Sequence, residues 1–200
     1  MPEPFEPNKD YILEDNCVLL RPLTADDFGN LLEFSVQEPN TWEYSLLTAS
    51  GEDNLRRYIT MALDARNRGQ EYPFIVFDKR TQEYAGSTRF YDIQPAFGTM
   101  QLGYTWYGQR FRGSGLNRHC KWLLLEFAFE QLGMERVEFR ADNSNARSIA
   151  AMKSIGCTVE GVLRHHMPKR GGGRRDSIVL SILRNEWFSR VKDLLAEQCA

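Results

Sequence analysis

The chain has 200 residues, of which 42% are hydrophobic and 26% are charged, and its formal net charge is −2 at pH 7. This length suffices for one domain with a substantial core and is short for two. The nearly neutral charge excludes a general electrostatic attraction to nucleic acid or to anionic membranes, so an anion site must be a local cluster.

Cysteine and histidine positions argue against a metal site. The four cysteines form no CxxC pair, and with the three histidines they show no zinc-ligand spacing. No apolar run is long enough to span a bilayer, and the first residues lack the apolar core of a signal peptide. We therefore expect a cytoplasmic protein with reduced thiols, no metal and no membrane contact.

The N-terminal part of the chain predicts an arm, a strand and two helices. Residues 1–16 are polar and carry three prolines, which favours an arm that precedes one domain over residues 17–200. A short apolar run then predicts a strand over 17–23. Two residue pairs have the spacing of a capping box at a helix start: Thr24 with Asp27, and Ser50 with Asp53.

The rest of the chain alternates strands with helices. Three strand-like runs with short turns between them predict an antiparallel meander: 72–78, 83–93 and 99–107. Apolar residues at helical spacing predict the clearest helix of the chain over 116–128. The remaining expected elements are a strand at 135–142, a helix at 143–156, a strand pair at 158–167 and 176–183, and a helix at 185–197. The order βααβββαβαββα predicts one α/β (α+β) domain with a mixed sheet.

A glycine-rich loop, GQRFRGSGLN, separates the meander from the clearest helix. Unpaired N–H groups and the dipole at a helix start attract an anion, and Gly113 and Gly115 leave no side chain that would keep a phosphate away from the backbone. Arg110 and Arg112 add charge that can pair with phosphate oxygens. The loop lacks the Lys-Ser/Thr ending of a P-loop. Anion binding without nucleotide hydrolysis is therefore one interpretation, and a plain surface turn is the other.

Five short motifs, in order along the chain, resemble the GNAT superfamily of N-acetyltransferases. They are Leu102-Gly103-Tyr104, the loop from Arg112 to Asn117, Asn145 with Ser148, Gly156-Cys157, and the tail EGVLRHHM…GGGRRDSIVLSIL. The loop departs from the family pattern at Asn117, where a small residue is usual and where the asparagine would cap the helix. The resemblance covers residues 17 to 187 and points to the branch that contains ribosomal-protein alanine acetyltransferases and their small-molecule relatives.

This resemblance implies a single GNAT-like domain with a mixed, mostly antiparallel sheet that splays, and acetyl-CoA as the acetyl donor substrate. It implies that backbone N–H groups of the loop hold the pyrophosphate, that the strand edge before the loop pairs with the pantetheine arm, and that an asparagine after the next strand contacts the cofactor. The expected cofactor-binding residues are Thr105, Trp106, Tyr107, Arg110, Arg112, Gly113, Ser114, Gly115, Leu116, Asn117 and Asn145.

Acetyl transfer to an amine needs a base that removes a proton and an acid that protonates the leaving thiolate. The resemblance offers Ser148 as the acid, and a hydroxyl that bonds back to its own helix is the alternative. His166 is the candidate base and His165 the second imidazole, because imidazole titrates near neutral pH. A structural role is the alternative for either histidine, and water is another base. Asp176 would orient a histidine or bind the amine.

Acceptor binding is expected between the first two helices. Trp42, Glu43 and Tyr44 would provide a floor for a cationic amine, and simple packing is the alternative. The basic turn PKRGGGRR is expected to be solvated, with recruitment of an acidic protein or of ribosomal RNA as the alternative. Apart from such ribosome association no nucleic acid is expected, and a homodimer is compatible with the sequence.

Two functions therefore remain open. One is an acetyl-CoA-dependent N-acetyltransferase for a primary amine, either a protein N-terminus or a small amine. The other is an acyl-CoA-binding module of the same fold without turnover. Two replacements favour the second: Gln101 stands where some family members have a glutamate, and Met152 stands where many have a tyrosine acid.

Overall fold

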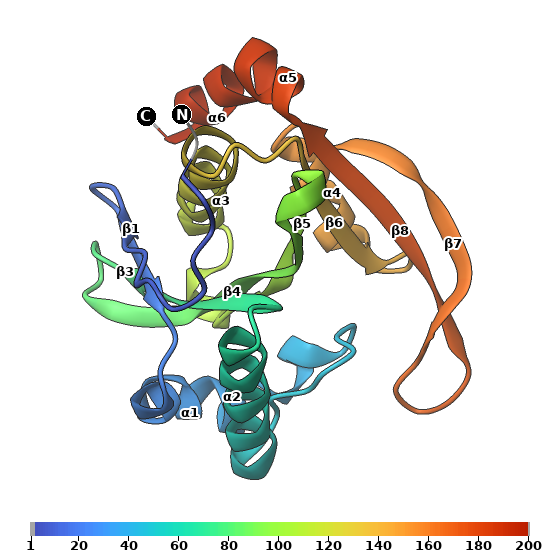
Figure 1. Cartoon of the computed structure of the whole chain (residues 1–200). Coiled ribbons are helices and arrows are strands. Elements are labelled where there is room, and N and C mark those ends of the chain that lie inside the picture. Colours follow the sequence, from blue (N-terminus) through green and yellow to red (C-terminus); the bar gives the residue numbers. More distant parts are fainter. Residues whose placement is uncertain (1–2, 200) are drawn as a thin grey trace.

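The computed structural model describes residues 3–199, which form one eight-stranded sheet with helices on both faces (Figure 1). The strands are β1 (Leu13–Glu14), β2 (Val18–Pro22), β3 (Glu71–Asp78), β4 (Glu83–Gln94), β5 (Thr99–Tyr107), β6 (Arg136–Asp142), β7 (Thr158–Pro168) and β8 (Arg174–Leu183). The helices are α1 (Phe28–Gln37), α2 (Glu52–Asn67), α3 (Leu116–Glu126), α4 (Ala146–Ser154), α5 (Arg184–Glu186) and α6 (Lys192–Cys199). The predicted order of elements is confirmed, with β1 added in front.

The sheet has the order β1-β2-β3-β4-β5-β6-β8-β7, and every neighbouring pair is antiparallel except β5 with β6. The parallel pairing joins only Thr99–Gln101 to Arg136–Glu138. Past Gln101 the two strands separate, so the predicted mixed and splayed sheet is confirmed. The β5 edge from Leu102 to Tyr107 therefore has no strand partner on its β6 side within the described chain.

A bulge in β5 lies inside this unpaired stretch. Ser87 pairs with Trp106 while Arg89 pairs with Gly103, so Tyr104 and Thr105 together oppose one residue of β4. Tyr104 has a φ of 49°, a left-handed conformation that a residue with a side chain rarely adopts. Such a bulge bends the strand and turns its backbone groups, which helps β5 to leave β6.

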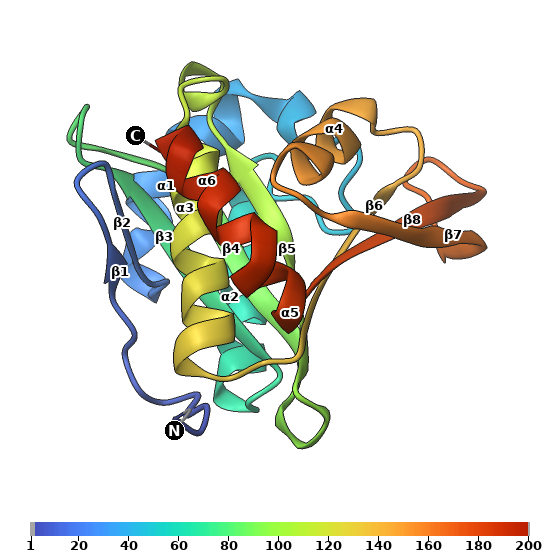
Figure 2. The same ribbon diagram turned by 90° about the horizontal axis from the view of Figure 1, so that it is seen from above.

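Helices cover the two faces of the sheet separately, as Figure 2 shows with α3 and α6 in front and α1 and α2 behind. The apolar stripe predicted for α3 is confirmed, since all six of its residues are buried: Leu116, Cys120, Leu123, Leu124, Phe127 and Ala128. The last two belong to a π-helical segment, Phe127–Gln131, that continues α3. No helix within residues 3–199 is long and apolar enough to cross a membrane.

The N-terminal segment was expected to be an arm outside the core, but part of it is packed into the core. Residues 1 and 2 lie outside the described part, but Tyr11 is buried, its ring centroid lies 4.7 Å from that of Phe127, and its N–H donates to the Tyr72 hydroxyl at 2.9 Å. Leu13 is buried as well, in β1. Two apolar side chains in a polar stretch are enough to attach it, because burying each one stabilises the contact by about 1.5–3 kcal/mol.

One of the two predicted capping boxes forms. The Thr24 N–H donates to Asp27 Oδ2 at 2.9 Å, and Arg21 pairs with the same carboxylate at 2.6 Å. The box at Ser50 is wrong, because α2 is capped by Gly51, whose φ of 85° is favourable only for glycine.

Candidate active site

The glycine loop between β5 and α3 presents bare backbone to open space. Gly113 and Gly115 have φ angles of 75° and 87°, and a Cβ added at either would meet no atom within 4 Å. Within residues 3–199, the N–H groups of Gly113, Ser114, Gly115 and Asn117 have no hydrogen-bond partner. Four unpaired donors at the start of a helix are what an anionic group such as a pyrophosphate requires.

Two of the six expected backbone donors are already used. The Arg112 N–H donates to the Gln109 carbonyl at 3.1 Å, and the Leu116 N–H donates to Ser114 Oγ at 3.4 Å. Asn117 does not cap the helix, because Gly115 holds the N-cap position and Asn117 Oδ1 accepts from the Tyr107 hydroxyl at 3.3 Å.

The loop arginines contact protein groups that the sequence could not indicate. Arg110 pairs with Glu83 at 3.0 Å and with Glu33 at 3.4 Å. Arg112 donates to the Tyr107 carbonyl at 3.0 Å and to the Thr41 hydroxyl at 2.8 Å. Three of these four partners, Glu33, Glu83 and Thr41, lie far from the loop in sequence, and both guanidinium groups already make hydrogen bonds within the protein.

A third arginine, which sequence reasoning missed, supports the loop. Arg80 pairs with the buried Asp78 at 2.7 Å and donates to the Ser114 carbonyl at 3.0 Å. This pair ties the end of β3 to the loop. No motif marks Arg80, because only the folded chain brings the turn after β3 next to the loop.

Positive charge concentrates where the loop meets α4. Burial, and then the neighbouring Arg147 at the start of α4, lowers the pKa of Arg112. The like charges of Arg112 and Arg147 repel each other, and an anion bound between them would reduce this repulsion.

The three residues whose backbone is expected to pair with the pantetheine arm have side chains that point into the protein. Thr105 Oγ1 lies 2.7 Å from the hydroxyl of Thr88. Trp106 is buried against Trp42, with ring centroids 5.1 Å apart. Tyr107 is buried, which raises the pKa of its phenol. The backbone of these three residues, not their side chains, thus remains available on the unpaired edge of β5.

A buried lysine lies beneath the splay, and no sequence signal distinguished it from the rest of α3. Lys121 is 5% exposed, and its ammonium donates to Thr105 Oγ1 at 3.0 Å and lies 5.9 Å from the centre of the Phe139 ring. Burial lowers the pKa of Lys121 to about 8. No carboxylate pairs with it in the described chain, so its charge is costly where it lies.

Asn145 and Ser148 lie on the first turn of α4. Asn145 Oδ1 accepts from the Ser148 N–H at 3.1 Å, so this asparagine caps the helix. The Ser148 hydroxyl is half-buried and makes no hydrogen bond within residues 3–199, so the bond back to its own helix does not form here. A hydroxyl without a partner is available to a ligand.

The two histidines lie at a bulge that the alternation pattern of β7 did not reveal. The register shifts between Leu163 and Met167, and His165 has a φ of 52°. Its side chain is exposed. Among residues 3–199 the Asp176 carboxylate makes no hydrogen bond to an imidazole; it accepts from the His165 backbone N–H at 2.8 Å and thereby holds the bulge.

The side chain of His166, unlike that of His165, contacts β8. Its Nδ1 lies 3.0 Å from Ser177 Oγ, which also accepts from Arg175 Nε at 3.0 Å. Burial, then Arg140 and Arg175, lowers the pKa of His166, so the ring is neutral at pH 7 and able to accept a proton. Ser177 is therefore a partner of the histidine that the sequence did not indicate.

The expected acceptor segment divides into a buried and an open part. Trp42 is 1% exposed and belongs to the core, whereas Glu43 and Tyr44 are exposed. The basic turn is only partly solvated: Arg170 donates to the Trp42 carbonyl and Arg175 to the Tyr44 carbonyl, each at 3.2 Å. These bonds hold the tip of the β7–β8 hairpin against the α1–α2 connection. Between the hairpin tip and the α1–α2 connection lies a hollow of about 370 Å³, lined by Pro39, Asn40, Glu43, Arg170 and Gly171.

Comparison with known proteins agrees with this geometry. The model of the acetyltransferase (GNAT) domain family matches residues 18–158. "Uncharacterized N-acetyltransferase p20" of Bacillus licheniformis is 27% identical over 84% of this chain and 93% of its own length. "Putative ribosomal N-acetyltransferase YdaF" of Bacillus subtilis is 25% identical over 84% and 91%. A GCN5-related N-acetyltransferase from Brucella melitensis superimposes with a TM-score of 0.87 at 25% identity, covering 98% of this chain and 88% of that one. The chain belongs to the GNAT family of acetyl-CoA-dependent N-acetyltransferases.

Proposed function

We propose that this acetyltransferase moves the acetyl group of acetyl-CoA to the α-amino group of a protein chain. The observation that carries the proposal is the set of four unpaired amides at the start of α3, next to the unpaired edge of β5. The loop amides would bind the pyrophosphate, and the β5 backbone from Thr105 to Tyr107 would pair with the amides of the pantetheine arm. Arg112 and Arg147 would attract the phosphates.

Two residues divide the proton transfers in this proposal. The neutral imidazole of His166 removes a proton from the acceptor ammonium, directly or through water, and the free amine then attacks the thioester carbonyl. The carbon–sulfur bond breaks, and the Ser148 hydroxyl gives its proton to the departing thiolate. The nitrogen of the new amide loses its second proton, which replaces the serine proton through water, and His166 releases the proton it took to solvent, so the site returns to its starting state. The half-buried, unpaired hydroxyl and the lowered pKa of His166 support these roles.

The hollow beside Glu43 supports a peptide as the acceptor. The hollow is open to solvent, so an extended chain end can enter, and the Glu43 carboxylate in its lining can hold the ammonium. The name of the YdaF relative refers to a ribosomal acceptor, which is compatible with a basic N-terminal segment of a ribosomal protein as substrate here. Asn145, through the α4 cap, would hold Ser148 in place.

Release of free thiol from acetyl-CoA tests the proposal. Peptides that begin with Ala, Ser or Met are compared with the same peptides carrying a blocked N-terminus and an internal lysine, and with small polyamines. We expect thiol release only with free N-termini, and fragment-ion mass spectrometry should place the acetyl group on the first residue. Transfer to polyamines alone would overturn the peptide acceptor. Acetyl-CoA binding in calorimetry without thiol release from any amine would identify a non-catalytic binding module instead.

A further inference from the structure

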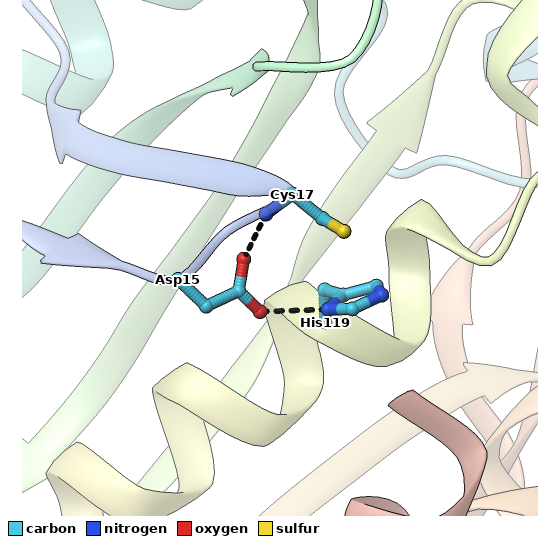
Figure 3. A group of neighbouring side chains, drawn as sticks. All are labelled: Asp15, Cys17 and His119. Atoms are coloured by element: carbon cyan, nitrogen blue, oxygen red, sulfur yellow. Dashed lines mark hydrogen bonds and ion pairs between the residues drawn. The ribbon is translucent and has the colours of Figure 1, made fainter. Parts of the chain in front are cut away.

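A thiol, an imidazole and a carboxylate lie close together near the start of α3, and none of them is among the residues assigned to catalysis (Figure 3). They are Asp15 and Cys17, in the turn between β1 and β2, and His119, in the first turns of α3. One potential ligand atom from each side chain lies within 4.8 Å of the other two. All three residues are half-buried, so the cluster is shielded from bulk solvent while an ion can still reach it.

Hydrogen bonds fix the orientation of these side chains. Asp15 Oδ1 accepts from the N–H groups of Cys17 at 2.7 Å and Val18 at 2.8 Å, which holds the carboxylate in the turn. Its other oxygen, Oδ2, lies 2.7 Å from His119 Nδ1. Figure 3 shows the Cys17 sulfur over the same ring. One carboxylate oxygen is thus committed to the backbone, while the second faces the imidazole and the thiol.

We propose that Asp15, Cys17 and His119 bind a divalent transition-metal ion of the zinc class. Thiolate, imidazole and carboxylate are the ligands that zinc takes in proteins, at about 2.3 Å for sulfur and about 2.0–2.2 Å for nitrogen and oxygen. Tetrahedral bond angles then place neighbouring ligand atoms roughly 3.3–3.6 Å apart. The observed separations reach this range with side-chain shifts of about 1 Å.

Ion binding releases one proton in this proposal, the Cys17 thiol proton, which passes to solvent as the metal–sulfur bond forms. The His119 imidazole binds in its neutral form and keeps its N–H proton on the ring nitrogen that does not bind the ion, and Asp15 binds as the carboxylate. The bound ion would join the β1–β2 turn to α3 only four residues after Gly115. The sequence argued against a metal because the ligands come from distant segments, and spacing rules detect only ligands that lie close together in the chain.

Zinc titration of the reduced, metal-free protein tests the site, with a chromophoric chelator as competitor. We expect one saturable site per chain, and at least a tenfold loss of affinity in Cys17→Ser and in His119→Asn. Cys157→Ser and His165→Asn are the matched controls, and both should bind zinc within about twofold of the unchanged protein. Cobalt(II) in place of zinc should give a thiolate-to-metal charge-transfer band that Cys17→Ser abolishes.

A second readout does not depend on the competitor. Zinc should raise the thermal midpoint of the unchanged protein and of the controls, and leave the two cluster variants unmoved, because a ligand of the folded state alone stabilises it. The nearly isosteric Cys17→Ser decides the matter if His119→Asn does not fold. The absence of saturable zinc binding to the folded protein, or equal affinity in Cys17→Ser, would overturn the proposal, whatever the acetyl-transfer assay shows.

Discussion

Replacing Gly115 by alanine should separate backbone strain from the loss of an anion site. Gly115 is the N-cap of α3 with a φ of 87°, and an added Cβ meets no protein atom within 4 Å. A matched control exists elsewhere in the chain, because Gly51 is the N-cap of α2, has a φ of 85° and also has open space around it. A side chain is strained at both positions, and more so at Gly51, because its ψ of 155° lies in a region that almost only glycine adopts, whereas the ψ of −18° at Gly115 belongs to the left-handed helical region.

Both variants should lose stability, Gly51→Ala at least as much as Gly115→Ala, and only Gly115→Ala should lose cofactor affinity. A side chain in the left-handed region costs about 1–2 kcal/mol, which lowers the melting temperature of a 150–250-residue domain by roughly 2–8 °C. At Gly115 the methyl group also stands beside the free amides. Losing one hydrogen bond to a charged group costs about 1.5–3 kcal/mol, so the Kd for acetyl-CoA should rise roughly 10- to 150-fold in Gly115→Ala.

Calorimetry with acetyl-CoA, together with thermal melts of both variants, measures the two effects. We expect Gly51→Ala to bind acetyl-CoA like the unchanged protein despite its lower melting temperature. Unchanged affinity in a folded Gly115→Ala would refute the assignment and reduce the loop to a bend. Equal loss of affinity in both variants would refute it too, since the effect would then come from stability alone.

Three further substitutions test the proton transfers and the buried charge. Ser148→Ala should lower kcat at least about 10²-fold with little change in acetyl-CoA affinity, because proton donation to the thiolate occurs only in the transition state; initial rates and calorimetry measure this. His166→Gln should remove the acidic limb of the kcat/KM profile, which lies below pH 6.5 because burial and neighbouring arginines lower the pKa of His166. Lys121→Met should raise the unfolding free energy at pH 7 by about 1–3 kcal/mol, as urea titrations would show, because it removes a buried charge.

For each of these three substitutions, one result would contradict the expected role of the residue. Normal turnover of Ser148→Ala would mean that water protonates the thiolate, and an unchanged pH profile in His166→Gln would exclude this imidazole as the base.

For Lys121 the folded pKa of about 8 lies below the ordinary value of 10.5, so the folded chain binds fewer protons between these values and its stability rises with pH across that window. Lys121→Met should lose this rise and the exposed Lys153→Met should keep it. The same pH dependence in both variants would contradict the buried charge.

Local patterns in the sequence determined most of the architecture. The apolar stripe of α3 is buried as predicted, and alternation with short turns located the meander of β3, β4 and β5. Both signals depend on neighbours within a few residues, since a helix or a strand must bury one face whatever it packs against. The glycine loop belongs here as well: positive φ angles and a helix start follow from its own residues.

Tertiary structure alone decided the partners of the charged and polar side chains. The contacts of Arg110 with Glu33 and Glu83, the bond from Arg80 to the loop, and the burial of Lys121 beneath Thr105 all join residues far apart in the chain. The bulge at His165 belongs to this group, because it depends on register with β8.

The approach of Cys17 and Asp15 to His119 spans more than a hundred residues and left no trace in the spacing of ligands. A side chain's partner is set by the free energy of the whole packed arrangement. Periodicity reports only which face a residue occupies, so the sequence determined the elements and the loop, and the folded chain determined what their charged and polar groups meet.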